Sequence, residues 1–163
     1  MRVRRWLIAV AAYLVVAAVV GLSAAAGWFY WDRVQTRGEQ AARTVLPQLA
    51  AKEVPEVFAY DYQTVERSLA AAYPLLTPDY RQEFQKSANM QIIPEAKKRE
   101  VVVQANVVGV GVMSAKRESA SVMVYLNRTV TDKSRQPLYD GSRLRVDFKR
   151  IGNKWLIAYI TPI

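Results

Sequence analysis

The chain has 163 residues, enough for one apolar segment and one small domain but not for two domains. It contains neither Cys nor His, which excludes disulfides, thiolate metal sites and the histidine-based hydrolytic triads. The net charge of +9 suits anionic lipid headgroups or an acidic partner.

An apolar stretch opens the chain. No charged residue occurs from Trp6 to Trp31. As a helix this stretch would rise about 39 Å, whereas the apolar core of a bilayer is about 30 Å thick. The sequence therefore predicts a transmembrane helix over residues 6–31.

Charged and aromatic residues flank this stretch and predict its orientation. Aromatic side chains favour the membrane–water interface, and the expected anchors are Trp6, Trp28, Phe29, Tyr30 and Trp31. The topology determinants are Arg2, Arg4 and Arg5. By the positive-inside rule, residues 1–5 are cytoplasmic and the part after Trp31 lies on the outer face of the plasma membrane. A cleaved signal peptide is the alternative, since small residues at 23–26 resemble a cleavage site.

The next part of the chain reads as helical. Residues 32–59 form the predicted stalk and first domain helix, with a kink or restart expected at Pro47 and Pro55. A second helix is expected after Asp61, and a third begins with Thr77 as its cap. This third helix is expected to end before Pro94, and the basic residues 97–99 are interpreted as a solvated linker.

From Val101 onward the apolar period changes to two, which is typical of strands. The apolar phase flips between Val107 and Val108, as in a β-bulge. Three more strands follow, and a long connection is expected over residues 132–141. The sequence thus predicts an α+β fold over residues 60–163, in which helices pack on the concave face of a curved, four-stranded antiparallel sheet.

A sheet of this kind often leaves a pocket. Its candidate rim residues are Tyr62, Tyr80 and Tyr125, and Tyr60, Asp61 and Asp147 are further polar groups that fit such a place. An Asp–Tyr pair there would suit an isomerase or dehydratase. Capping by Asp61 and pairing of Asp147 with a neighbouring Arg explain the same residues structurally, so no catalytic, cofactor or metal residue is predicted.

Eight short stretches, in this order, resemble the Mce-associated membrane proteins of actinobacteria: residues 58–64 (FAYDYQT), 75–81 (LLTPDYR), 101–103 (VVV), 108–112 (VGVGV), 125–129 (YLNRT), 140–143 (DGSR), 155–156 (WL) and 161–162 (TP). The resemblance implies a cone of the nuclear-transport-factor-2-like or cystatin-like kind. It also implies a non-enzymatic accessory subunit that stabilises an Mce (mammalian cell entry) lipid or sterol importer in the cell envelope.

The expected partners are Mce transporter subunits and membrane lipids. Nucleic acid is not expected, because the basic residues are spread over strands and turns and do not cluster with aromatic ones. Two alternatives stay open at this point. One is a lipid-binding module with a ligand pocket in its cone, and the other is the isomerase or dehydratase.

Overall fold

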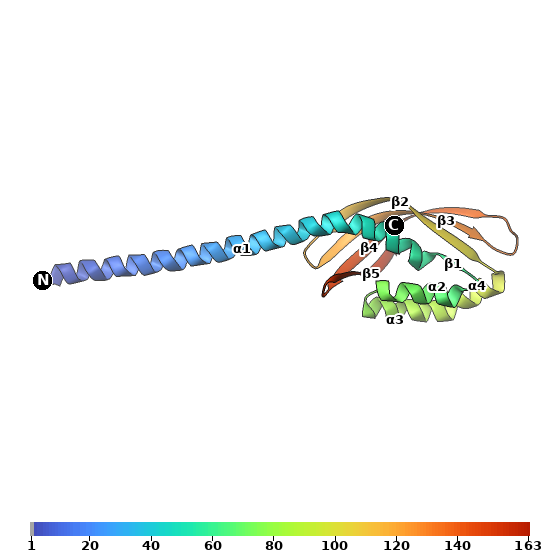
Figure 1. Ribbon diagram of the computed structural model, residues 1–163, viewed down its shortest axis with the longest axis horizontal. Coiled ribbons are helices and arrows are strands. Elements are labelled where there is room, and N and C mark those ends of the chain that lie inside the picture. Colours follow the sequence, from blue (N-terminus) through green and yellow to red (C-terminus); the bar gives the residue numbers. More distant parts are fainter. Residues whose placement is uncertain (1) are drawn as a thin grey trace. The chain divides into compact units, whose positions relative to one another are not determined.

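A computed structural model describes residues 2–163, but not the side chains of residues 2–16, Ala24, Phe29 and Asp32. The chain divides into two compact units, residues 1–37 and residues 38–163. Helix α1 (Arg2–Phe58) has residues in both units, and the second unit is the folded domain (Figure 1).

Within the described residues, the domain combines short helices with one antiparallel sheet in the order β1-β2-β3-β4-β5. The strands are β1 (Tyr60–Asp61), β2 (Val102–Ala115), β3 (Ser119–Thr131), β4 (Leu138–Ile151) and β5 (Lys154–Pro162). The helices after α1 are α2 (Val65–Ala72), η1 (Tyr73–Leu75), α3 (Pro78–Ser87), the π-helical turn η2 (Ala88–Ile92) and α4 (Ile93–Arg99).

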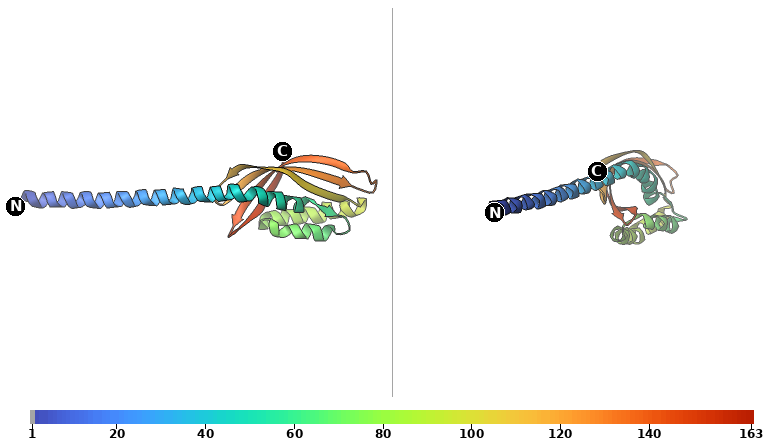
Figure 2. Two further views of the ribbon diagram at one scale, coloured as in Figure 1. Left: turned by 45° about the horizontal axis from the view of Figure 1, so that its top comes forward. Right: turned by 60° about the vertical axis from the view of Figure 1, so that its left-hand side comes forward.

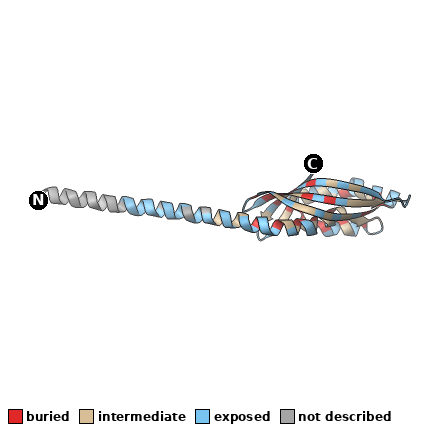
Figure 3. Ribbon diagram, turned by 90° about the horizontal axis from the view of Figure 1, so that it is seen from above, coloured by how far each residue is buried: buried red, intermediate tan, exposed pale blue. Residues whose placement is uncertain are grey.

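The main core lies between the sheet and the last part of α1. Apolar residues of α1 recur at helical spacing on one buried face: Ala42, Leu46, Ala50, Val54 and Val57. They pack with the inward-facing residues of β3 and β4, where every second side chain is buried. Figure 2 shows the sheet curving around this part of α1, with α2, α3 and α4 on the same side. Figure 3 marks the buried positions along α1 and the strands.

The bend of the sheet has a local cause in β2. Val107 pairs with Leu126, but the next paired residue is Gly109, opposite Tyr125. The unpaired Val108 is 59% exposed. This β-bulge confirms the change of phase predicted there, and bulges increase the bend and twist of the strand that carries them.

The predicted fold class is wrong on two points. The sheet has five strands rather than four, because the two-residue strand β1 pairs with Val102 and Val103 and is too short to show an alternating pattern. A membrane crossing needs about 20 apolar residues, and no helix in the described part of the chain offers such a stretch. The meander of four long strands is confirmed.

Several residues that supported the membrane prediction lie outside the described side chains. These are Arg2, Arg4, Arg5, Trp6 and Phe29. The remaining predicted anchors, Trp28, Tyr30 and Trp31, belong to α1 and are 76%, 72% and 63% exposed.

Three details of the chain path also differ from the expectations. Helix α1 continues through Pro47 and Pro55 without a restart, since the buried residues around each proline hold the backbone against the sheet. The segment expected to be a linker after Pro94 is α4, where Pro94 occupies a first-turn position that needs no amide hydrogen. The predicted long connection is shorter than expected, because β4 already begins at Leu138.

Candidate functional site

A cleft of about 760 Å³ lies in the domain between two separate hydrophobic clusters. The first cluster joins α1 to the sheet and contributes Val57 to the cleft. The second joins α2, η2 and α4 to the start of β2 and contributes Leu69, Ala96 and Val103. Phe84 of α3 packs against both clusters. The cleft therefore lies where the two clusters meet, and it is open to solvent on one side.

The cleft wall is mainly apolar. Its apolar side chains come from α1, the helical layer and strands β2 to β4: Val57, Phe58, Leu69, Phe84, Ile92, Ala96, Val101, Val103, Val130, Leu138 and Tyr139. Leu138 and Tyr139 are 67% and 76% exposed, so they extend the apolar wall to the surface. Apolar walls with a few polar groups are typical of small-molecule sites.

One ion pair at the edge of the cleft joins β3 to β4. The Arg128 guanidinium donates hydrogen bonds to Asp140, with Nε 3.1 Å from Oδ2, and it lies 5.7 Å from the centroid of the Phe58 ring. Hydrogen bonds from Arg128 and Ser142 hold the pKa of Asp140 below its ordinary value. Both charges of the pair are thus retained at neutral pH.

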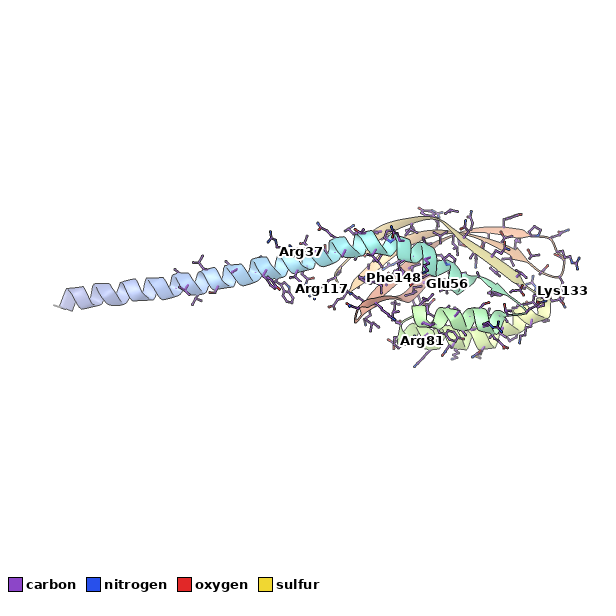
Figure 4. The ribbon with its side chains drawn as sticks, viewed as in Figure 1. Arg37, Glu56, Arg81, Arg117, Lys133 and Phe148 are labelled. Atoms are coloured by element: carbon purple, nitrogen blue, oxygen red, sulfur yellow. The ribbon has the colours of Figure 1, made fainter. Side chains whose placement is uncertain are left out.

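A second ionic group joins α4 to the tip of the β3–β4 hairpin. Arg99 Nη2 lies 2.9 Å from Asp132 Oδ2, and Arg99 Nη1 lies 3.6 Å from Glu95 Oε1. The hydrogen bond from Arg99, aided by Ser134, lowers the pKa of Asp132 to about 2. Figure 4 labels Lys133 at this hairpin tip, and its Nζ lies 3.6 Å from Glu100 Oε1. These pairs hold the hairpin against the end of α4.

The three predicted rim residues do not meet at this cleft. Tyr62 packs against the second hydrophobic cluster. Tyr80 lines a smaller cavity of about 200 Å³ beside Phe58 and Ile160, and burial, followed by Glu83 and Tyr159, raises its pKa to about 12. Tyr125 lies 45% exposed on β3.

The other polar candidates are also dispersed. Tyr60 lines the cleft, and burial raises the pKa of its hydroxyl. Asp61 accepts a hydrogen bond of 2.8 Å from the Gln63 amide. Asp147 accepts hydrogen bonds from Ser121 and from Arg145 Nε, the latter at 3.0 Å. In the described part of the chain, no three acidic side chains gather as a metal site.

Sequence reasoning missed the hairpin residues that extend the wall. Leu138 and Tyr139 fell in a segment expected to be a connection, so their strand pairing with Val130 and Thr129 was not anticipated. The signal that was present is the pair of adjacent large apolar side chains within a polar segment.

The chain is similar to curated mycobacterial proteins, although no protein-family model matches it. It is 25% identical over 144 residues to the outer membrane protein Rv1973 of Mycobacterium tuberculosis, covering 88% of this chain and 90% of that protein. It is also 25% identical over 142 residues to the uncharacterized protein Rv1362c of the same organism, covering 85% of this chain and 64% of that protein.

Solved structures share the fold at low sequence identity. An IcmL-like type IV secretion system protein from Legionella pneumophila superimposes with a TM-score of 0.63 at 13% identity, covering 74% of this chain and 93% of that chain. The periplasmic domain of DotI gives 0.63 at 14% identity, with 74% and 94% coverage. The VirB8 protein of Agrobacterium tumefaciens gives 0.54 at 12% identity, with 68% and 84% coverage. The likeness shows that this chain shares the α+β fold of these solved domains.

Proposed function

We propose that this chain is a non-enzymatic accessory subunit of a multi-protein assembly in the cell envelope. The observation that carries the proposal is the fold, which the chain shares with an IcmL-like type IV secretion system protein and with the periplasmic domain of DotI. The relative named as an outer membrane protein supports an envelope location.

The placement of the polar candidates supports a structural role over a catalytic one. An isomerase or dehydratase of this shape would need a carboxylate inside the cleft. Asp61 instead fixes the turn before α2, and Asp147 is bonded to Ser121 and Arg145. Neither side chain belongs to the cleft wall, and the two acids that do, Glu95 and Asp140, are each paired with an arginine.

The finer proposal concerns the assembly that the chain serves. The stretches described above resemble the Mce-associated proteins, and that resemblance supports a lipid or sterol importer of the Mce type as the partner. In this proposal the domain works on the outer side of the cytoplasmic membrane, where it docks on importer subunits and stabilises them.

The β3–β4 hairpin offers the most suitable docking surface among the described residues. Leu138 and Tyr139 are adjacent, large and mostly exposed, and two such apolar side chains in contact with water favour burial by a partner. The salt bridges from Arg99 and Lys133 to their acidic partners hold this hairpin in place. A preordered hairpin loses less conformational entropy when a partner binds.

Co-purification tests this proposal. The tagged chain should recover importer subunits from its native envelope, and Leu138→Ser should lower the recovered amount by about fivefold if one apolar anchor contributes about 1 kcal/mol. Met90→Ser is the matched control, because Met90 is 68% exposed and lies in η2.

The outcomes separate the coarse proposal from the finer one. Recovery of envelope proteins that are not importer subunits keeps the accessory role and rejects the Mce assignment. Recovery of no envelope protein rejects both. An equal loss with Leu138→Ser and Met90→Ser rejects the hairpin as the docking surface.

A further inference from the structure

The hydrophobic core of the domain is divided into two clusters, and a cleft lies between them. Val57 belongs to the first cluster, and Leu69 and Val103 belong to the second. All three side chains line one cleft of about 760 Å³. The cleft is open to solvent on one side, and a bound apolar molecule would displace water from its apolar wall and gain contacts there.

We propose that this cleft binds one uncharged long-chain lipid that carries a hydroxyl head, such as a monoacylglycerol or a fatty alcohol. The inference goes beyond the accessory role and does not depend on which assembly the chain joins. The alkyl chain lies between the two hydrophobic clusters, and the head lies near Tyr60, Gln91 and Glu95, whose side chains offer hydrogen-bond donors and acceptors.

The charges of the cleft exclude an ionised head. The wall contains two arginines, Arg99 and Arg128, and two acids, Glu95 and Asp140. Each arginine already has an acidic partner, and Asp132 adds a further negative charge beside Arg99. A lipid carboxylate would displace one of these acids or remain unpaired, and an ammonium head would meet the same arginines.

The helical layer beside the cleft supports a binding role independently. Gln91 and Ile92 line the cleft from η2, a π-helical turn placed between α3 and α4. Such turns have poorer hydrogen-bond geometry than an α-helix and occur frequently at functional sites. Here the turn directs Gln91 and Ile92 toward the gap between the clusters.

The volume fits a lipid of moderate length. Small-molecule sites in proteins span roughly 300–1,000 Å³, and the cleft lies within that range. It is open on the side of Leu138 and Tyr139, whose exposed side chains provide an apolar entrance. A chain of about 18 carbons would gain affinity on the order of a 10 µM dissociation constant.

Matched lipids test the head group. The full chain is titrated with radiolabelled monooleoylglycerol, oleate and oleylamine, each below the concentration at which it aggregates. We expect monooleoylglycerol to bind with one-to-one stoichiometry and both charged lipids to bind about tenfold more weakly. Equal or tighter binding of oleate or oleylamine overturns the proposed head-group class, and absence of monooleoylglycerol binding overturns the proposal.

Matched substitutions test the location. Val130→Trp puts an indole into the cleft and should weaken monooleoylglycerol binding at least about tenfold. Val108→Trp makes the same change on an exposed position outside the cleft and should leave binding unchanged. If Val130→Trp does not fold, Ile92→Trp inside the cleft and Ile151→Trp on the surface form a second pair. Equal effects of the two members of a folded pair overturn the location.

A change of rim charge tests the same site without filling it. Asp140→Asn leaves Arg128 without its acidic partner and should strengthen oleate binding about fivefold while monooleoylglycerol binding changes less than about twofold. Unchanged oleate binding overturns the charge argument. If the lipids do not bind but Val130→Trp abolishes recovery of a protein partner, the cleft is a polypeptide site and the lipid proposal is wrong.

Discussion

Glu53 is the described side chain least suited to its surroundings. It lies on α1 between the buried residues Ala50 and Val57, and its Oε2 is buried without a hydrogen-bond partner among the described residues. Burial, followed by the charge of Glu56, raises its pKa from 4.5 to about 7, while Lys52 acts in the opposite direction. An acid whose folded pKa is raised destabilises the folded state once it ionises.

The sign of the pH dependence follows from these two values. Below pH 4.5 Glu53 is protonated in both the folded and the unfolded chain. Between pH 4.5 and about 7 only the unfolded chain loses the proton, so the free energy of unfolding falls as the pH rises. Above about 7 the loss is complete.

Substitution of Glu53 tests this pH dependence. Glu53→Gln should raise the free energy of unfolding by about 1–2 kcal/mol at pH ~8, after allowance for the partial exposure of the side chain, and by much less at pH ~4. Urea unfolding at the two pH values measures the difference. Glu118→Gln in the exposed turn between β2 and β3 serves as the control, and an equal gain from Glu53→Gln at both pH values would contradict the assignment.

At the scale of elements, one close approach positions α1 against the sheet. A Cβ built on Gly38 would lie 2.9 Å from Arg117 Cγ and 3.3 Å from Arg117 Cα. Arg117 belongs to the turn between β2 and β3 and is labelled in Figure 4. Backbone atoms at that distance cannot move as freely as a side-chain end, so the absence of a side chain at Gly38 sets the spacing of helix and turn.

A larger side chain at this position should force the two elements apart. We expect Gly38→Leu to lower the free energy of unfolding by about 1–3 kcal/mol, although leucine alone favours the helix. Gly27→Leu makes the same change where no described atom lies within 4 Å of the added Cβ, and it should be neutral or stabilising. Chemical unfolding of both variants measures the two changes. Equal changes in the free energy of unfolding would show that the close contact with Arg117 does not affect stability.

The long strands were predictable because their signal is local. Leu144, Val146 and Phe148 alternate with charged residues, and all three are buried as that pattern requires. The helix starting after Thr77 was equally clear from Pro78 and Asp79. Strand β1 and the continuous path of α1 through Pro47 were not predictable, since each is held by packing between residues distant in sequence.

At the scale of the whole molecule, the cleft could not be read from the sequence. Its wall combines residues of α1, α2, α3, α4 and three long strands. Any of these apolar residues reads as ordinary core when taken alone. Only the tertiary arrangement shows that a cleft lies between the two hydrophobic clusters. The tyrosines predicted as rim residues were therefore chosen without knowing where this cleft lies.

Phe84 connects the two hydrophobic clusters, and its removal should affect the whole domain. It packs against both clusters and meets Tyr73 edge to face, with ring centroids 6.2 Å apart. Phe84→Ala should lower the free energy of unfolding by about 2–3 kcal/mol because both clusters lose contacts. Calorimetric unfolding measures the change, with the exposed Tyr139→Ala expected to cost less than about 0.5 kcal/mol. A loss as small as that of Tyr139→Ala would mean that Phe84 does not link the clusters.

The division into two clusters also predicts which helices of the domain open locally. Because the second cluster joins α2, η2 and α4 to the sheet mainly at the start of β2, we expect these short helices to open before the central strands do. Their amide protons should then exchange with deuterated water earlier than those of β3 and β4. A molecule seated between the layers would slow that exchange in the helices alone.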